Sequence, residues 1–305
     1  MAKLTDEQFS AYLAEAKAKL SAELPIAAEK KINYGYQYTV KLAEAKLTLN
    51  IYNGKKGLNI VYSGDSALAE RAAALLEGRK AQAAAPATFV TDGLWAGSDE
   101  SGKGDFFGSL VVAAVVVDNT TADRLRAAGV KDCKLLTDKK ILELEDIIKA
   151  SVVDYSVLEL KPRVYNLRYE QVAAQGGKLN QLLGYGHVAA LSKVLEKHED
   201  CHSALIDQFT TSMVNSRALK QRFPQCDVRQ QPKAESNLAV AAASVLARAQ
   251  FLHTMAALAA EAGVQALPKG GGAQATACAR ELAAKYGKEA LRNYVKLHFA
   301  NYQRV

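Results

Sequence analysis

The strongest constraint on the fold is a polar, glycine-rich segment at residues 97–108, GSDESGKGDFFG, which lies between two apolar runs. Residues 93–96, GLWA, precede it, and a run rich in β-branched side chains follows at residues 110–117. Short apolar runs on both sides of a glycine-containing loop predict a strand, a tight loop and a second strand. Two carboxylates are therefore expected to end the first strand just ahead of a Gly-Lys-Gly turn.

Asp99 and Glu100, close to the turn formed by Gly102, Lys103 and Gly104, predict a metal site beside a phosphate backbone. Carboxylate oxygens are the ligands of hard divalent cations, and glycines let backbone N–H groups approach a sugar-phosphate chain closely. The same spacing also matches a P-loop. However, a glycine stands where that motif needs a hydroxyl, acids occupy the loop interior, and a strand-like segment follows where a helix is needed. We therefore exclude a P-loop.

Two further acids fall at the ends of expected elements. Asp207 ends an apolar run at residues 204–206, and Glu235 opens a long apolar helix at residues 235–260. Strand ends and helix starts gather at one edge of an α/β sheet, so these acids can join the first pair around cations that position an attacking water. Taken singly, Glu235 is also explained by the helix dipole and Asp207 by a turn cap. Asp227 lies near Glu235 and competes for the fourth position.

Composition narrows the class of protein. The chain has 305 residues and a formal net charge of +7, which predicts about two domains and favours an anionic partner. The four cysteines have no paired spacing, which indicates neither a zinc site nor a disulfide framework. The N-terminal sequence lacks a signal-peptide pattern and the apolar runs are short for a bilayer, so we expect a cytoplasmic protein without a membrane partner. His187 and His298 lie on apolar segments and are expected to be structural.

Residues 1–85 predict a small α+β domain. Apolar periodicity predicts helices at residues 5–19 and 66–78, and Asn53-Gly54 is a hairpin turn signal. Alternating apolar and polar side chains predict three strands between the helices, at residues 34–40, 47–52 and 58–62.

This region also combines lysines with tyrosines. Residues 30–60 hold six lysines and one acid, with tyrosines interleaved. Such a face grips sugar-phosphate backbones, mostly without base specificity, and Tyr52, Lys55 and Lys56 are the predicted contacts. The alternative is that the tyrosines pack the sheet against its helices and the lysines only solvate the surface.

Residues 86–92 are expected to be a linker, because the alanine-rich segment around them has little periodicity. Residues 93–305 then alternate strands and helices, which predicts an α/β domain with a mixed sheet. The expected strands are residues 94–98, 110–117, 152–160, 204–207 and 228–231, and the expected helices are residues 138–150, 179–197 and 235–260.

Six blocks of this region resemble, in order, those of bacterial ribonuclease HIII: residues 97–108, 130–134, 206–209, 233–236, 239–244 and 296–301. The resemblance implies the ribonuclease H fold, a five-stranded mixed sheet with flanking helices and a C-terminal helical extension, preceded by a small TBP-like domain. It also implies an endonuclease that cleaves RNA paired with DNA. We expect a monomer without an obligate protein partner. The products would carry a 5′-phosphate and a 3′-hydroxyl, and the cofactor would be Mg²⁺ or Mn²⁺, two per site during catalysis.

By resemblance, Asp99, Glu100 and Asp207 are metal-binding catalytic carboxylates, and Glu235 is the fourth acid where type-2 enzymes carry aspartate. The Gly102-Lys103-Gly104 turn is similar to the Gly-Arg-Gly element of type-2 enzymes, whose backbone can meet the 2′-hydroxyl of RNA. The substrate contacts expected in this domain are Ser101, Gly102, Lys103, Gly104, Lys134, Asn166, Asn180 and Gln181.

The chain departs from the family pattern at two places. Cys133 stands where the family often has serine in Asp-Ser-Lys, and Tyr185 stands where a Trp-Gly-His block is common. Two other functions stay open at this point. One is a type-2-like enzyme that acts on single ribonucleotides in duplex DNA, and the other is a nucleic-acid-binding protein that keeps the fold without cleaving.

Overall fold

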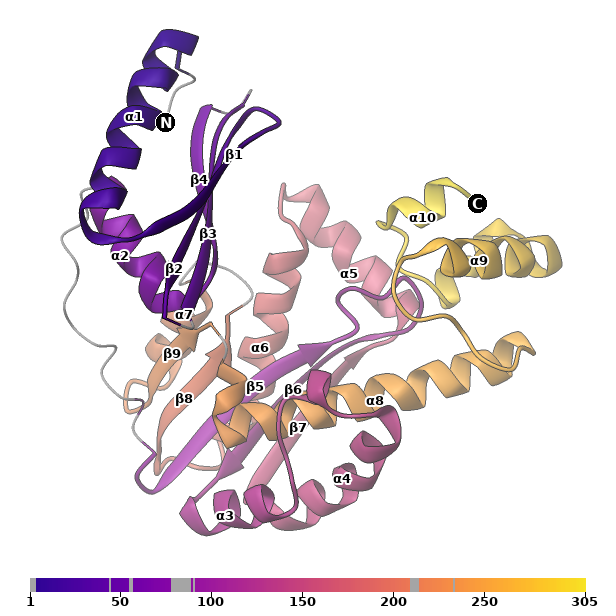
Figure 1. Ribbon diagram of the computed structural model, residues 1–305. Helices are drawn as coiled ribbons and strands as arrows, with labels where there is room; N and C mark the ends of the chain where they lie inside the picture. The colour runs from indigo at the N-terminus through magenta and orange to yellow at the C-terminus, as the bar shows by residue number, and fades with distance from the viewer. Residues whose placement is uncertain are drawn as a thin grey trace. The chain divides into compact units, whose positions relative to one another are not determined.

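The computed structural model describes residues 4–43, 45–54, 57–77, 89, 91–208, 214–232 and 234–305. The chain divides into two compact units, Met1–Thr88 and Phe89–Val305 (Figure 1). The division lies inside the segment at residues 86–92, and each unit has its own hydrophobic core.

The N-terminal unit is an antiparallel sheet in the order β1-β2-β3-β4 with two helices. Its elements are α1 (Asp6–Glu23), β1 (Ile26–Ile32), β2 (Gly35–Leu42), β3 (Ala45–Gly54), β4 (Gly57–Gly64) and α2 (Ser66–Glu77). A capping box at Thr5 and Gln8 starts α1. Leu20 of α1 and Leu76 of α2 pack on the same sheet face as Leu49, so both helices cover one face.

Two details of this unit differ from expectation. The edge strand β1 was missed, because its interior residues are exposed and show no apolar alternation. The expected turn at Asn53-Gly54 is wrong, since both residues belong to β3 and Gly54 pairs with Gly57 of β4.

The C-terminal unit contains a five-stranded mixed sheet in the order β7-β6-β5-β8-β9. Its strands are β5 (Leu94–Ser101), β6 (Leu110–Val117), β7 (Asp154–Leu160), β8 (Cys201–Asp207) and β9 (Asp227–Gln231). The pairs β5–β6 and β6–β7 are antiparallel, whereas β8 runs parallel to both β5 and β9.

The helices of this unit are α3 (Asn119–Ala127), α4 (Asp138–Ser151), α5 (Pro162–Ala174), α6 (Leu179–Leu195), α7 (Val214–Arg222), α8 (Leu238–Ala262), α9 (Ala273–Tyr286) and α10 (Ala300–Gln303). Short 3₁₀ turns lie at η1 (Cys133–Leu135), η2 (Ala234–Ser236) and η3 (Lys288–Asn293). The expected strands and the three expected helices are present, and α3, α5, α7, α9 and α10 come in addition.

The sheet is a middle layer. Every side chain of β6 is buried, which requires helices on both faces. Helices α3, α4 and α8 pack on one face, and α6 and α7 pack on the other (Figure 1). Gly97 allows α8 to lie close to β5, since a Cβ there would come within 2.3 Å of the Val240 backbone nitrogen.

Helix α8 is long and apolar enough to cross a membrane by length and composition alone, which the short apolar runs in the sequence had not suggested. Within its apolar window, 72% is buried inside the unit. It is therefore the central core helix of the C-terminal unit, as its contacts with β5, β6 and α4 show.

Candidate active site

Asp99 and Glu100 are consecutive residues of the central strand β5 and so point to opposite faces of the sheet. The Glu100 side chain meets α6, where His187 Nε2 lies 3.2 Å from Glu100 Oε2. The other ring nitrogen, Nδ1, lies 2.9 Å from Ser98 Oγ, on the same face of β5. Gly186 allows this approach, because a Cβ there would press on Val112 of β6 at 2.8 Å.

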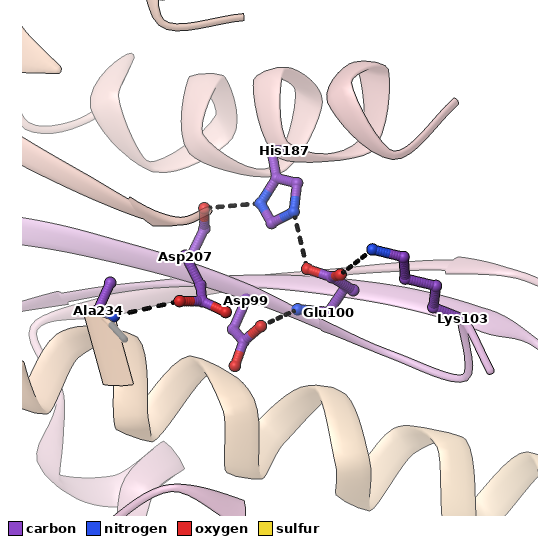
Figure 2. A network of polar contacts seen from close by, with 7 residues as sticks. Asp99, Glu100, Lys103, His187, Asp207 and Ala234 are labelled. Atoms are coloured by element: carbon purple, nitrogen blue, oxygen red, sulfur yellow. Dashed lines mark hydrogen bonds and ion pairs between the residues drawn. The ribbon is translucent and has the colours of Figure 1, made fainter. Parts of the chain in front are cut away.

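Lys103 provides the second partner of Glu100. Its Nζ lies 3.6 Å from Glu100 Oε1, so the carboxylate is held between a histidine and a lysine (Figure 2). Sequence reasoning expected His187 to be structural, and the structure shows that it contacts one of the candidate acids directly. The Tyr-Gly-His block was the signal that could have identified it.

Asp207 ends β8 beside β5, one residue beyond the pair Ser98 and Ile206. Its Oδ1 accepts a hydrogen bond of 3.1 Å from the backbone N–H of Ala234 (Figure 2). This contact ties the 3₁₀ turn η2, which carries Glu235, to the end of β8. Three elements that are far apart in the sequence therefore bring four acids into one region.

The structure also separates the two candidates for the fourth acid. Asp227 begins β9 and pairs with Ser203, whereas Gln231, at the far end of β9, pairs with Asp207. Because Asp227 and Gln231 are four residues apart on the strand, Asp227 lies about 13 Å along β9 from the residue that pairs with Asp207. Asp227 is instead bound to Arg229 on its own strand. The geometry thus favours Glu235.

The pKa shifts reveal how closely the acids interact. Burial, then the charges of Glu100 and Asp207, raise the pKa of Asp99 well above its usual value. The pKa of Asp207 is also raised. Burial is the largest cause and the charges of Glu235 and Glu100 add to it, whereas the hydrogen bond from the Ala234 N–H acts to lower the pKa. Burial would raise the pKa of Glu100, but its contacts with His187 and Lys103 outweigh burial and lower it.

Lys134 faces the same acids. Burial alone would lower its pKa, but the charges of Asp132, Asp99, Glu235 and Asp207 together raise it. Its backbone N–H donates to Asp132 Oδ1 at 3.0 Å, and the Cys133 N–H donates to Ser244 Oγ at 3.1 Å, which fixes η1 against α8. The positively charged side chain of Lys134 is thereby held close to the carboxylates.

A cavity of about 580 Å³ opens at this point. It is lined by Asp99, Glu100, Ser101, Gly102, Lys103, Gly104, Cys133, Lys134, Leu136, Asp138, Ile141, Asp207, Gln208 and Arg248. Five of the predicted substrate contacts, residues 101–104 and Lys134, are therefore brought together with the acids. In the described part of the chain, no three His, Cys, Asp or Glu side chains lie in an arrangement that could hold a metal ion.

The two glycines of the turn differ in their surroundings. Gly102 has φ 86°, and a Cβ there would lie 2.1 Å from the carbonyl oxygen of Ser109, so only glycine fits. A Cβ at Gly104 would meet nothing within 4 Å. The turn is thus fixed by packing at one glycine and open to an approaching ligand at the other.

The three predicted amide contacts lie elsewhere. Asn166 is only 3% exposed, and its side chain bonds the backbone of Arg292, Val295 and Leu297. The prediction that it contacts substrate is wrong, because its amide holds the C-terminal segment. Asn180 and Gln181 are exposed at the start of α6, and Gln181 Nε2 donates to Tyr185 Oη at 2.7 Å.

Some tyrosines of the N-terminal unit pack the core of the sheet, and Tyr52 lies on the other face, where it could contact a sugar-phosphate backbone. Tyr38 is 2% exposed within the core, and Tyr36 packs against that core, as the alternative interpretation predicted. Tyr52 is half-buried on the sheet face away from the helices, because it alternates with the core residue Ile51. Lys55 and Lys56 lie outside the described residues.

Comparison with known proteins identifies the family. The model of the family described as ribonuclease HII matches residues 96–302. Ribonuclease HIII of Bacillus subtilis (strain 168) is 40% identical over 218 residues, which cover 68% of this chain and 66% of that protein. Ribonuclease HIII of Chlamydia pneumoniae is 37% identical over 211 residues, which cover 68% of this chain and 69% of that protein.

The chain spans slightly less than two thirds of the length of some of these relatives. It covers 66% of the Bacillus subtilis protein and 65% of ribonuclease HIII of Protochlamydia amoebophila (strain UWE25). Among solved structures, that of Bst-RNase HIII in complex with Mn²⁺ superposes with a TM-score of 0.64 at 29% identity, over 99% of this chain and 96% of that one. The five-stranded mixed sheet with helices on both faces is the ribonuclease H fold. The chain therefore belongs to the ribonuclease HII family, within its ribonuclease HIII group.

Proposed function

We propose that this chain is an endoribonuclease that cleaves the RNA strand of RNA/DNA hybrids and leaves a 5′-phosphate and a 3′-hydroxyl. One observation carries the proposal: a cavity holds Asp99, Glu100 and Asp207 together with Lys134 and an open Gly-Lys-Gly turn. Carboxylates that bind cations, a lysine for phosphate and an accessible backbone are the parts that phosphodiester hydrolysis requires. Membership of the ribonuclease HIII group supports it.

The donor set fits a hard divalent cation. Asp99, Glu100 and Asp207 offer oxygen ligands. Burial first, and neighbouring negative charge second, raise the pKa of Asp99 and of Asp207, and a bound cation would offset both effects on the ionised carboxylates. We propose that these three residues hold Mg²⁺ or Mn²⁺, two ions per site during catalysis. The related Bst-RNase HIII was solved with Mn²⁺. The cations would supply an activated water and neutralise charge on the phosphate.

The protein's own groups have distinct tasks in this proposal. His187 and Lys103 orient Glu100, and the Ala234 N–H orients Asp207, so each carboxylate has a fixed direction. Lys134 attracts the phosphate beside the scissile bond. Gly104 leaves the turn unobstructed, so that backbone groups can reach a 2′-hydroxyl and distinguish RNA from DNA.

The N-terminal unit would bind the hybrid backbone. The sheet face away from α1 and α2 carries Lys30, Gln37, Asn50 and Tyr52, with Gln37 Nε2 donating to Asn50 Oδ1 at 2.8 Å. Neutral amides, an aromatic ring and lysine suit sugar-phosphate contacts that do not depend on base sequence.

The test is cleavage of an end-labelled RNA/DNA hybrid with Mg²⁺ and with Mn²⁺. Single-stranded RNA and duplex DNA containing one ribonucleotide serve as the other substrates, and the Asp99→Asn variant controls for host nuclease. We expect cleavage of the continuous hybrid at several positions. Absence of cleavage would indicate a binding protein, and faster cleavage at the single ribonucleotide would indicate a type-2-like enzyme.

A further inference from the structure

Lys296 is a completely buried lysine that the proposed mechanism does not use. It is 0% exposed, and its Nζ lies 2.8 Å from the carbonyl oxygen of Asp105, 2.7 Å from that of Gly108 and 3.4 Å from that of Phe107. No carboxylate of the described residues lies at ion-pair distance from it. Burial of an amino group is costly unless its hydrogen bonds are satisfied, so these carbonyls are its principal partners.

All three carbonyls belong to the loop that continues the Gly-Lys-Gly turn. Strand β5 ends at Ser101 and β6 begins at Leu110, so residues 102–109 lack the pairing of the sheet. The C-terminal segment supplies that pairing. Phe107 forms an antiparallel bridge with Val295, the Lys296 N–H donates to the Phe106 carbonyl, and the Gly108 N–H donates to the Tyr294 carbonyl.

A second anchor holds the same loop. The Gly270 N–H donates to Asp105 Oδ1 at 2.6 Å, and the Phe106 N–H donates to the Gly270 carbonyl at 3.1 Å. The Asp105 N–H in turn donates to the Gly102 carbonyl at 3.3 Å, which links the clamped residues to the turn itself. The position of the turn on the cavity wall therefore depends on residues almost two hundred positions further along the chain.

We propose that Lys296 is a positioning residue for substrate recognition: its buried amino group clamps residues 105–108 and thereby holds the Gly102-Lys103-Gly104 turn in the shape that meets the RNA backbone. This inference rests on the proposed function for the identity of the ligand. A turn that is preorganised binds without an ordering cost, whereas a loosened turn must be ordered at each binding event.

The experiment compares Lys296→Met, which keeps the length of the side chain and removes the donor, with the wild-type chain. Hydrogen exchange read by mass spectrometry measures the amides of residues 102–109, and steady-state cleavage of the hybrid measures KM and kcat. We expect exchange in this loop to become at least about 10-fold faster and KM to rise about 10-fold, since binding contacts are lost. Asp105→Ala removes the side-chain bond of the second anchor and should shift both quantities in the same direction by less.

Two controls separate positioning from general effects. Lys288→Met makes the same substitution at an exposed lysine of the C-terminal extension, whose Nζ donates to the Val305 carbonyl and lies over the Tyr302 ring, so it reports on a lost charge and on contacts that do not involve the loop. Leu282→Ala removes buried apolar contacts of α9 and none of the hydrogen bonds to the loop, so it lowers stability and the active fraction, which reduces kcat without raising KM. Neither control should speed exchange at residues 102–109 selectively.

The inference is overturned if Lys296→Met leaves loop exchange and KM unchanged, or if it behaves as Leu282→Ala does. If Lys296→Met does not fold, Asp105→Ala tests by the same two readouts whether a loosened loop raises KM, and unchanged values overturn the inference. If the wild-type chain does not cleave the hybrid, the proposed function fails, and the exchange measurement still reports whether Lys296 holds the loop.

Discussion

Asp99 and Asp207 are carboxylates that are buried and also close to other negative charges, so keeping them ionised carries an electrostatic cost. Both have a raised pKa, with burial as the largest cause. We expect Asp99→Asn or Asp207→Asn to reduce hybrid cleavage at least about 100-fold, the scale on which one preorganised transition-state contact acts. Circular dichroism and hybrid binding should stay close to wild type. Near wild-type turnover, in a preparation free of host nuclease, would remove that residue from the site.

Glu235 and Asp227 can be ranked against each other. Glu235 interacts electrostatically with both Asp207 and Lys134, whereas Asp227 binds Arg229 at the opposite end of β9. Glu235→Gln should therefore lower kcat far more than Asp227→Asn in steady-state kinetics. The reverse ranking would show that the Lys-Ala-Glu-Ser block was misassigned. Each substitution removes one negative charge, so the pair is matched for general electrostatic effects.

Lys296 predicts a pH dependence of stability. Burial lowers its pKa to about 7, partly opposed by Asp105, from 10.5 in the unfolded chain. Between these values the unfolded state binds a proton that the native state does not, so the free energy of unfolding rises with pH across this window. One group contributes up to about 1.4 kcal/mol per pH unit.

We therefore expect the free energy of unfolding from urea denaturation to rise more steeply from pH 7 to 9 in the wild-type chain than in Lys296→Met. Other titrating groups are common to both proteins, so the difference in slope isolates Lys296. Equal slopes would mean that the buried amine keeps an ordinary pKa. The two short bonds to Asp105 and Gly108 can be made by a neutral amine, so deprotonation does not by itself release the loop.

At the level of elements, the connection between β5 and β6 combines a fixed glycine and an open one. Gly102→Ala would place a methyl group 2.1 Å from the Ser109 carbonyl at φ 86°, so we expect a loss of stability of more than about 1 kcal/mol. Gly104→Ala meets nothing within 4 Å, so it should fold normally and instead weaken hybrid binding. Thermal denaturation and a binding titration of both variants check this division. Equal stability losses would contradict it.

The sequence predicted the elements that carry strong local patterns. The apolar run of β6 was recognisable because the strand is buried on both faces. Helix α8 was recognisable from its long, mostly apolar sequence, since most of its residues lie in the core. The edge strand β1 and helix α5 were not, because exposed polar residues dominate them and only tertiary pairing fixes their state.

The site divides in the same way. The acids and the glycine turn lie in short motifs, so their chemistry is local. The pairing of His187 with Glu100, across 87 residues, and the structural use of Asn166 depend on how α5 and α6 pack, which no local spacing encodes. The C-terminal clamp on the turn is likewise a long-range contact, and Lys296 was visible in the sequence only as part of a family-like block.

At the scale of the whole molecule, the candidate catalytic acids and the lysine-containing four-stranded sheet belong to different units. The N-terminal unit has its own core built from α1, α2 and the four strands, and the C-terminal unit contains every candidate catalytic acid. A domain with a complete core of its own can be removed without exposing the core of the other. Deleting residues 1–88 should therefore leave a folded C-terminal unit that retains its cleavage chemistry.

The truncated protein should hold the hybrid much less tightly. If lysines of the N-terminal sheet bind phosphates, each lost contact reduces the slope of log affinity against log salt by about 0.9, a value for B-DNA applied to the hybrid. The loss should appear mainly as a higher KM at moderate salt, with kcat at saturating hybrid nearly unchanged, because the acids remain in place. Fluorescence titrations of both proteins at several salt concentrations measure the slope. Unchanged affinity together with an unchanged slope would show that the lysines and tyrosines of this sheet form only a solvated surface, and that the N-terminal unit serves another purpose.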